Sequence, residues 1–459
     1  MTNINQYINQ LFSVNEIKLD ENKRKLFESY IIQSDVADLI NQISKNQQLL
    51  MDKWALLNRS TSISEQIVRV PNGIVGKPYF AVLDFDALGW IDLQLLELKI
   101  QAETGLFYAP EQKAIMGTPT SSGDYKIELR YQLNESADQT YLKEIAIVIN
   151  PDPKSLWKNL ECDEHDIYYK PDIALNSGTF SDKHFVVASK RGRSHANIGG
   201  FREDHYVLES FEETGWNLIA LADGAGSAKY SRKGSALACE SIGNYFREVL
   251  TTEITKEIVE LRNSAVLTPS ELILDIMKSG VAKVHSDLAK FALENHSELK
   301  DFHTTLIFVL LKKIGTGYLI LSFGVGDCPM AVVNKAQTQV TLLNNLDVGA
   351  YGGGTRFITM PEIFSSGDFE ARFTFRFQDD FSFMFLMTDG IFDPKFETEA
   401  ALTRIENWQK FINDLNGQNE SKSRVDFSIP NPELSDQLSQ WMDFWSQGNH
   451  DDRTLAIFY

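Results

Sequence analysis

The chain has 459 residues, 43% of them hydrophobic and 23% charged, which is the balance of a folded globular protein with more than one domain. Its formal net charge of -19 at pH 7 argues against nucleic acid or an anionic membrane surface as partner, because both require clustered Lys and Arg. The cysteines Cys162, Cys239 and Cys328 lie far apart without metal-site spacing, and the start has no signal-peptide pattern, so a cytoplasmic location is expected.

Residues 1–62 have the pattern of amphipathic helices. Apolar residues such as Val36, Leu39, Ile40 and Ile43 recur at three- and four-residue spacing. This spacing predicts a helical N-terminal segment. A small helical cap and a dimerisation element both fit the pattern.

Residues 63–152 change to a period of two. Tyr125, Ile127, Leu129 and Tyr131 alternate with polar neighbours, and turn signals separate such runs, which predicts a β-sandwich. The stretch 104–125 resembles the immunoglobulin-like domains of bacterial multidomain proteins. A generic β-meander spacer is the alternative interpretation. Two prolines and an acidic cluster then predict a linker over residues 153–180.

Residues 181–459 read as an α+β domain. Two amphipathic helices, one carrying Cys239 and Phe246 and the other Met277 and Leu288, lie between apolar strand candidates. The expected strands are 185–189, 216–222, 304–312, 318–323, 330–334, 381–387 and 454–459. Consecutive strands with long helices inserted imply layered antiparallel sheets.

Acidic residues stand at the ends of these strands. They are Asp204, Asp223 followed by Gly224, Asp389 followed by Gly390, and the pair Asp451 and Asp452. An Asp at a strand end offers hard oxygen ligands, and a following Gly lets the backbone carbonyl approach a metal ion. Any one Asp-Gly pair is more often a plain turn, but several acidic strand ends in one domain also fit a site for Mg²⁺ or Mn²⁺, and the spacing alone leaves both interpretations open.

The order of short motifs in this domain resembles the type 2C metal-dependent protein phosphatases. The motifs are Arg-Glu-Asp at 202–204, Ala-Asp-Gly-Ala-Gly at 222–226, Gly-Val-Gly-Asp at 324–327, Thr-Asp-Gly-Ile-Phe-Asp at 388–393 and Asp-Asp-Arg-Thr at 451–454. A bacterial branch is most similar, since it opens with a segment like Arg-Gly-Arg-Ser-His at 191–195 and has a loop like 349–359.

The resemblance implies a four-layer α-β-β-α sandwich that hydrolyses phosphoserine and phosphothreonine through a hydroxide bridging two Mn²⁺ or Mg²⁺ ions, with Asp204 and Asp223 central to catalysis. The implied metal ligands are Asp204, Asp223, the Gly224 carbonyl, Asp389 and Asp451, with Asp327 and Asp393 at a weaker third metal site. For Asp327, capping a tight turn is an equal alternative.

Two positions depart from the family pattern. Ala225 stands where many members carry a His that protonates the leaving group, and His195, a water or the third metal could replace that His. His195 could equally only fix a turn by hydrogen bonding. The family's phosphate-gripping Arg has no counterpart just before Asp204, so Arg191, Arg193 and Arg202 are the candidates.

Two functions therefore remain open at the level of sequence. The first is a protein phosphatase acting on a phosphoprotein, with the N-terminal part recruiting the substrate or a partner kinase. The second is a catalytically impaired phosphatase fold that acts as a binding or regulatory module. The complete acidic set favours the enzyme, whereas the two departures favour the binding module.

Overall fold

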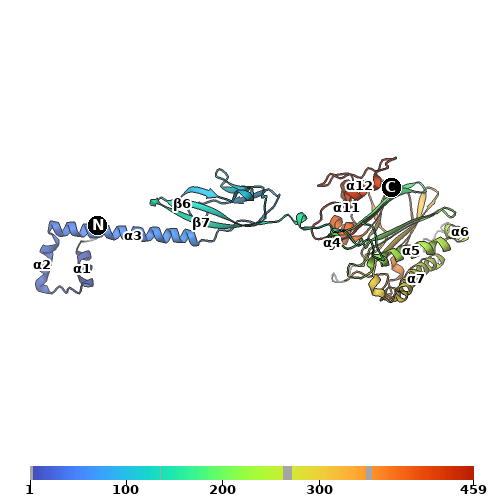
Figure 1. Cartoon of the computed structure of the whole chain (residues 1–459), viewed down its shortest axis with the longest axis horizontal. Coiled ribbons are helices and arrows are strands. Elements are labelled where there is room, and N and C mark those ends of the chain that lie inside the picture. Colours follow the sequence, from blue (N-terminus) through green and yellow to red (C-terminus); the bar gives the residue numbers. More distant parts are fainter. Residues whose placement is uncertain (1–3, 135, 262–270, 348–353) are drawn as a thin grey trace. The chain divides into compact units, whose positions relative to one another are not determined.

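The computed structural model describes residues 4–134, 136–261, 271–347 and 354–459. The chain divides into two compact units, Met1–Leu156 and Trp157–Tyr459 (Figure 1). Within the described ranges, no helix is long and apolar enough to cross a membrane.

The first unit begins with three helices. They are α1 (Ile4–Val14), α2 (Glu21–Ile31) and α3 (Ser34–Glu65). The Asp20 side chain caps α2 by accepting a 3.0 Å hydrogen bond from the Lys23 backbone N–H. Ile8, Val36 and Ile40 form a small buried cluster between the helices. The helices thus occupy the segment predicted to be helical. Of the regularly spaced apolar residues, Val36 and Ile40 lie where these helices pack together.

The rest of the first unit is two sheets. Its strands are β1 (Gly73–Ile74), β2 (Tyr79–Val82), β3 (Leu93–Lys99), β4 (Leu106–Ala109), β5 (Ala114–Gly117), β6 (Gly123–Leu133) and β7 (Ser136–Asn150), with a short 3₁₀ helix η1 (Ala102–Thr104). One sheet has the order β1-β7-β6-β3 and the other β2-β5-β4. Tyr79 and Ile115 from the smaller sheet share a buried cluster with Ile127 and Ile147 from the larger one, so the sheets pack face to face.

The segment predicted as a linker is only partly irregular. A 3₁₀ helix η2 (Pro153–Leu156) ends the first unit, but β8 (Ile173–Phe180) pairs antiparallel with β9 (Lys183–Lys190) along its whole length. The linker prediction is therefore wrong for residues 173–180. β8 is an edge strand with mostly exposed side chains, so it lacks the apolar pattern by which buried strands are recognised.

The second unit contains the remaining elements. Its further helices are α4 (Arg193–Ile198), α5 (Ser231–Val249), α6 (Thr252–Leu261), α7 (Glu271–Glu294), α8 (Glu362–Ser365), α9 (Asp389–Phe396), α10 (Glu399–Leu402), α11 (Ile405–Leu415) and α12 (Leu434–Trp441), with 3₁₀ turns η3 (Leu299–Phe302) and η4 (Glu370–Arg372). Its further strands are β10 (His205–Phe211), β11 (Trp216–Ala222), β12 (Leu306–Ile314), β13 (Gly317–Val325), β14 (Met330–Asn334), β15 (Val340–Leu342), β16 (Phe373–Gln378), β17 (Phe381–Met387) and β18 (Arg453–Phe458).

Two antiparallel sheets face each other in this unit. Their strand orders are β10-β11-β12-β13-β16 and β15-β14-β17-β18-β9-β8. Ile219 and Ile307 of the first sheet share a buried cluster with Val187 and Ala456 of the second. Leu218, the neighbour of Ile219 in β11, is buried in the cluster on the opposite face of the sheet. Both faces of β11 are therefore buried, which explains its unbroken apolar run.

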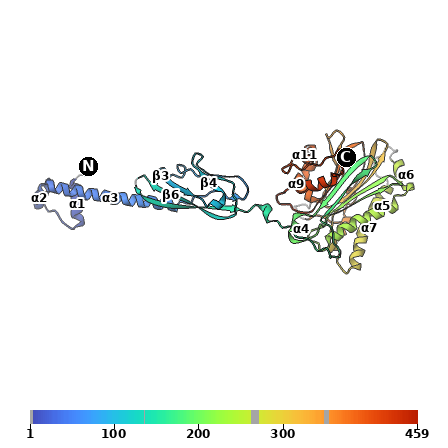
Figure 2. The ribbon, with the colours of Figure 1, turned by 45° about the horizontal axis from the view of Figure 1, so that its top comes forward.

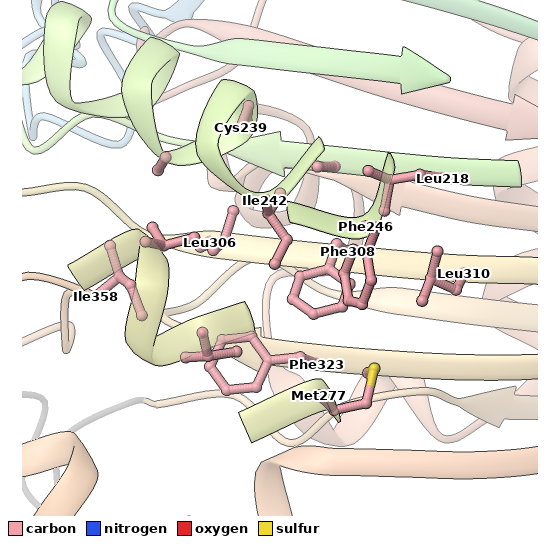
Figure 3. Packing of buried hydrophobic residues seen from close by; sticks show 14 of the residues in the cluster. Leu218, Cys239, Ile242, Phe246, Met277, Leu306, Phe308, Leu310, Phe323 and Ile358 are labelled. Atoms are coloured by element: carbon pink, nitrogen blue, oxygen red, sulfur yellow. The ribbon is translucent and has the colours of Figure 1, made fainter. Parts of the chain in front are cut away.

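Helices cover the outer face of each sheet. Figure 2 shows α5 and α7 along one side of the strands and α9 and α11 along the other. On the first side, Ile242 and Phe246 of α5 pack against Phe308, as the close-up in Figure 3 shows. On the other side, Trp408 and Trp441 pack in a cluster with strand residues of β17 and β18. The strand ends are thereby held in fixed positions.

We expect Phe308→Ala to lower the free energy of unfolding of the second unit by about 3–5 kcal/mol, because the ring is buried between Phe246 and Phe323 and its loss leaves a cavity. Urea denaturation followed by tryptophan fluorescence measures the change. Leu293→Ala, at a position with 78% exposure, is the control and should shift the same transition by less than about 0.5 kcal/mol. Equal midpoints for the two variants would contradict this description of the core.

Candidate metal-binding site

Four carboxylates meet at a cavity of about 200 Å³. They are Asp223 after β11, Asp327 after β13, Asp389 at the start of α9 and Asp451 before β18. Because these positions end strands or begin elements in both sheets, the facing sheets bring together residues that are far apart in the sequence. Of the strand-end acids marked in the sequence, Asp223, Asp389 and Asp451 therefore line one cavity, whereas Asp204 and Asp452 do not line it.

Asp204 is fully buried and is not among the cavity-lining residues. Its Oδ2 accepts hydrogen bonds from the hydroxyls of Thr388 at 2.9 Å and Thr454 at 2.7 Å. Its Oδ1, and Oδ1 of Asp389, are buried without a hydrogen-bond partner among the described residues. Buried carboxylate oxygens rarely remain unpaired, so both atoms are suited to bind a cation.

Burial and nearby negative charge raise the pKa values of the carboxylates in this cluster. Burial raises the pKa of Asp223 well above its usual value, and the charges of Asp389 and Asp204 raise it further. Burial, followed by the charges of Asp451 and Asp327, does the same for Asp389. Burial and the charge of Asp452 raise the pKa of Asp204 to about 7. Such a cluster is fully ionised near neutral pH only with cations between its members.

The Asp223 loop is fixed by backbone contacts to the start of β12. The Asp223 N–H donates to the Thr305 hydroxyl at 2.9 Å, and the Asp223 carbonyl accepts from the Thr304 hydroxyl at 2.8 Å. Gly224 pairs with Thr304 in an isolated β-bridge. A Cβ on Gly224 would lie 2.9 Å from Ser231 Cβ, so only glycine fits. This close packing explains the Asp-Gly pair at the strand end.

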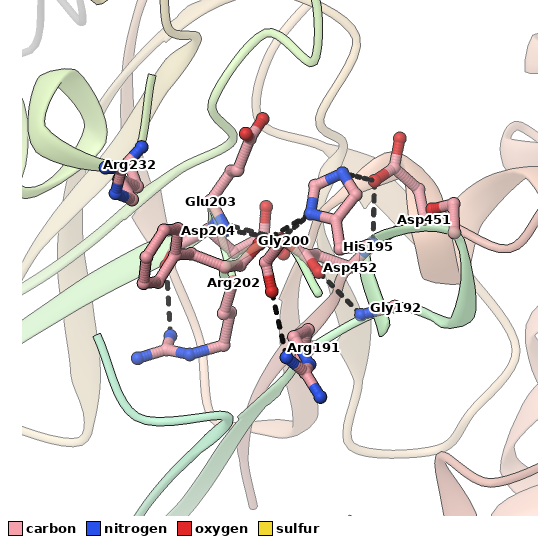
Figure 4. Close-up of polar contacts among 12 residues, drawn as sticks. Arg191, Gly192, His195, Gly200, Arg202, Glu203, Asp204, Arg232, Asp451 and Asp452 are labelled. Carbon is pink, nitrogen blue, oxygen red and sulfur yellow. Dashed lines mark hydrogen bonds and ion pairs between the residues drawn. The ribbon is translucent and has the colours of Figure 1, made fainter. Parts of the chain in front are cut away.

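Asp452 joins three loops at the edge of the site. It is 2% exposed; its Oδ1 accepts from the Gly192 N–H at 2.5 Å and its Oδ2 accepts from the Glu203 N–H (Figure 4). His195 Nδ1 lies 3.4 Å from the same Oδ2. Burial acts to raise the pKa of Asp452, but the His195 contact and the backbone hydrogen bonds lower it overall. The sequence marked Asp451 as the ligand and gave no role to its neighbour, which holds the motifs together.

A family model described as Protein phosphatase 2C matches residues 191–443, more than half of the chain. The chain belongs to the protein phosphatase 2C family.

Solved structures similar to this chain include several phosphatases. A bacterial serine phosphatase is 13% identical, with 60% of this chain and 96% of that chain covered and a TM-score of 0.35. The catalytic domain of the serine/threonine phosphatase PstP in complex with two manganese ions is 14% identical, with 62% and 98% covered and a TM-score of 0.36. Stp1 from Staphylococcus aureus is 13% identical, with 66% and 97% covered and a TM-score of 0.34. No curated protein matches the chain.

The candidate arginines of this phosphatase 2C chain do not reach the cavity. The Arg191 guanidinium donates to the Gly200 carbonyl at 2.8 Å and forms an ion pair with Asp172 at 2.9 Å. Arg202 is 2% exposed and donates to the Asp204 carbonyl at 2.9 Å. Both guanidiniums bind other parts of the fold and neither lines the cavity, and a phosphate-binding role for one of them stays a prediction. None of the described residues lining the cavity is basic.

His195 lies beside the carboxylates and does not line the cavity. Its Nδ1 is 2.6 Å from the Phe201 carbonyl, and its Nε2 is 3.5 Å from Asp451 Oδ1. Burial acts to lower the pKa of His195, but Asp452, Glu203 and Asp451 outweigh it and raise the pKa to about 10. A charged imidazole held in this way fits the turn-fixing alternative better than proton donation.

The position of the missing family His is occupied by Ala225, whose N–H donates to the His303 carbonyl at 3.0 Å. The His303 ring stacks on Phe357, a cavity-lining residue, with centroids 5.0 Å apart. Burial lowers the pKa of His303. Sequence reasoning missed this His because it lies before β12, far in sequence from every motif.

The two acids implied in a third metal site are placed differently. Asp327 lines the cavity and accepts a 2.7 Å hydrogen bond from the Thr355 hydroxyl. Asp393 is exposed, accepts from Asn449 Nδ2 at 3.1 Å and does not line the cavity. Of the loop expected at 349–359, residues 349–353 lie outside the described residues.

Asp204 predicts a pH dependence of the metal-free chain. Its pKa is raised to about 7 in the folded state from 3.8, so between about pH 4 and 7 the folded state binds more protons than the unfolded state. The free energy of unfolding in EDTA should therefore fall as pH rises from about 4 to 7. It should fall by less in Asp204→Asn, because the asparagine cannot titrate. This difference is measured by thermal unfolding, following the same transition that Phe308→Ala shifts.

Asp287→Asn is the matched control for this prediction. Burial acts to raise the pKa of Asp287, but hydrogen bonds from Lys283 and Ser241 lower it overall. Its contribution to stability is therefore present above the unfolded pKa and lost as pH falls. The free energy of unfolding of wild type minus that of Asp287→Asn should therefore rise with pH, whereas the difference between wild type and Asp204→Asn should fall. The same pH trend in both comparisons would rule out the assigned environment of Asp204.

Proposed function

We propose that residues Trp157–Tyr459 act as a metal-dependent serine/threonine protein phosphatase. The observation that carries the proposal is the convergence of family-motif carboxylates on one cavity, with two buried oxygens lacking partners. The proposed ligands are Asp204, Asp223, the Gly224 carbonyl, Asp389 and Asp451, with Asp327 and Asp393 at a weaker third metal site. The exposed position of Asp393 makes Asp327 the better supported of the last two.

The donor set fits hard divalent cations. Every proposed ligand is a carboxylate or carbonyl oxygen, which suits Mn²⁺ and Mg²⁺. When bound, two such ions would lower the pKa of a shared water and neutralise charge on the phosphoryl group, which is the chemistry of phosphate-ester hydrolysis.

The chain's own residues would position this chemistry. Thr388 and Thr454 hold the Asp204 carboxylate, and Thr304 and Thr305 hold the Asp223 loop. No basic side chain is found among the described lining residues, so phosphate binding would depend on the ions themselves. We therefore expect the KM for a phosphorylated substrate to depend strongly on the metal.

We further propose that the two facing sheets with helices on both outer sides form the four-layer α-β-β-α sandwich implied by the resemblance. The face-to-face sheets of residues 63–152 support an immunoglobulin-like domain, which would recruit a phosphoprotein substrate or a partner kinase.

A binding module without catalysis is the second candidate. Ala225 provides no proton donor, and the guanidiniums of Arg191 and Arg202 are engaged elsewhere. On this alternative the acidic cavity would bind cations without turnover.

Asp223→Asn distinguishes the two functions. We expect wild type to hydrolyse p-nitrophenyl phosphate and a phosphothreonine peptide with Mn²⁺ or Mg²⁺ and not with EDTA, and Asp223→Asn to lose activity by at least about 100-fold, because a proposed metal ligand loses its charge. Asp287→Asn, on α7 and outside the cavity lining, should retain wild-type activity. A folded wild type that is inactive with every metal would favour the binding module.

A further inference from the structure

The segment 157–172, here called the strap, precedes the region matched by the family model and packs against the loops of the metal site. It contains neither helix nor strand. The ring centroids of Trp157 and His450 are 4.4 Å apart, and His450 precedes Asp451 in the sequence. The Leu160 N–H donates to the Ala196 carbonyl of α4 at 2.8 Å. The strap therefore contacts α4 and the residue that precedes Asp451.

Lys170 is the most deeply engaged residue of the strap. Its side chain is 7% exposed, and its amino group lies 2.6 Å from the Asp204 carbonyl and 3.4 Å from the Glu203 carbonyl. It also lies 3.3 Å from the Arg232 carbonyl and from Ser235 Oγ, both in the first turns of α5. All four acceptors are uncharged oxygens. A buried lysine without a paired carboxylate is costly, so a purely stabilising role accounts poorly for it.

We propose that Lys170 is a positioning residue of the metal site. Its amino group joins the backbone of Glu203 and Asp204 to the start of α5 and so fixes where the Asp204 carboxylate stands. This inference rests on the proposed role of Asp204 as a metal ligand. Groups that orient a ligand in this way typically change metal affinity by about 10–100-fold when they are removed.

The loop has enough other hydrogen bonds to stay folded without Lys170. The Asp204 carbonyl also accepts from Arg202 Nη1 at 2.9 Å, and the Glu203 carbonyl accepts from the Ser235 hydroxyl. Arg202 Nε in turn donates to the Pro171 carbonyl of the strap at 3.1 Å. Removing the lysine amino group therefore leaves no carbonyl of this loop unpaired. We expect the carboxylate to be less precisely held rather than the fold to be lost.

Lys183 is a matched control within the same unit. It is 5% exposed, donates to the Phe381 carbonyl at 2.6 Å and pairs with Asp380 at 2.8 Å. It begins β9, whose other end pairs with the start of β18 next to Asp452. Lys183→Met therefore removes a buried amino group, one that is paired with Asp380, at the end of β9 far from the carboxylates of the metal site.

The test compares Lys170→Met and Lys183→Met in the full chain by calorimetric titration with Mn²⁺. Lys170→Met should bind Mn²⁺ about 10–100-fold more weakly, with hydrolysis approaching the wild-type rate at saturating Mn²⁺. Lys183→Met should bind Mn²⁺ like wild type even where its thermal midpoint falls. Wild-type affinity in Lys170→Met, or equal losses in both variants, would overturn the proposal.

A second pair of variants covers the case in which Lys170→Met does not fold. Ser235→Ala removes the hydroxyl that links Lys170 to the Glu203 carbonyl, whereas Ser241→Ala removes a hydroxyl of the same helix that donates to Asp287. We expect weaker Mn²⁺ binding in Ser235→Ala alone. Unchanged binding in Ser235→Ala would count against the proposal.

Calorimetry separates this inference from the proposed function. A wild type that binds Mn²⁺ but hydrolyses nothing would end the enzymatic proposal, while a specific loss of affinity in Lys170→Met would still support the positioning role. A wild type that binds no Mn²⁺, or binds it no better than Asp223→Asn, would overturn both.

Discussion

Repulsion between carboxylates buried at one end of two sheets is the constraint on which the rest of this unit depends. Asp204, Asp223 and Asp389 are largely removed from water, and burial together with neighbouring carboxylates raises the pKa of all three. Without cations the cluster opposes its own ionisation, so the surrounding structure must hold the loops against that repulsion. The threonines at 304, 305, 388 and 454 and the buried Asp452 do so by binding backbone and carboxylate atoms directly.

The sheets supply the rigidity that these loops need. β11 and β12 are buried on both faces, between helices on one side and the second sheet on the other. Their apolar side chains fix the strand ends, and the site is built where the strands stop. A rigid frame also explains why the ligand positions can come from distant parts of the sequence.

Strands and site residues that have a local sequence pattern could be predicted from the sequence. Continuous apolar runs identified β11, β14 and β17, and an Asp-Gly at a strand end identified Asp223 and Asp389. The exposed edge strand β8 has no such pattern, and the arginines looked available because nothing local shows that Arg202 is buried. Lys170 was missed for the same reason: its importance lies in contacts to residues 203, 204, 232 and 235, which only the folded chain brings to it.

The charge balance of the cavity links these observations. Its described lining contains four carboxylates and no basic side chain, so bound cations would be the positive charge available to a phosphoryl group there. The contacts that fix the positions of the carboxylates would then govern both metal affinity and substrate affinity. Because Lys170 belongs to the strap, that control would extend to a segment outside the region the family model matches, at the point where the second unit begins. The catalytic apparatus would therefore start at the strap and not at the first family motif.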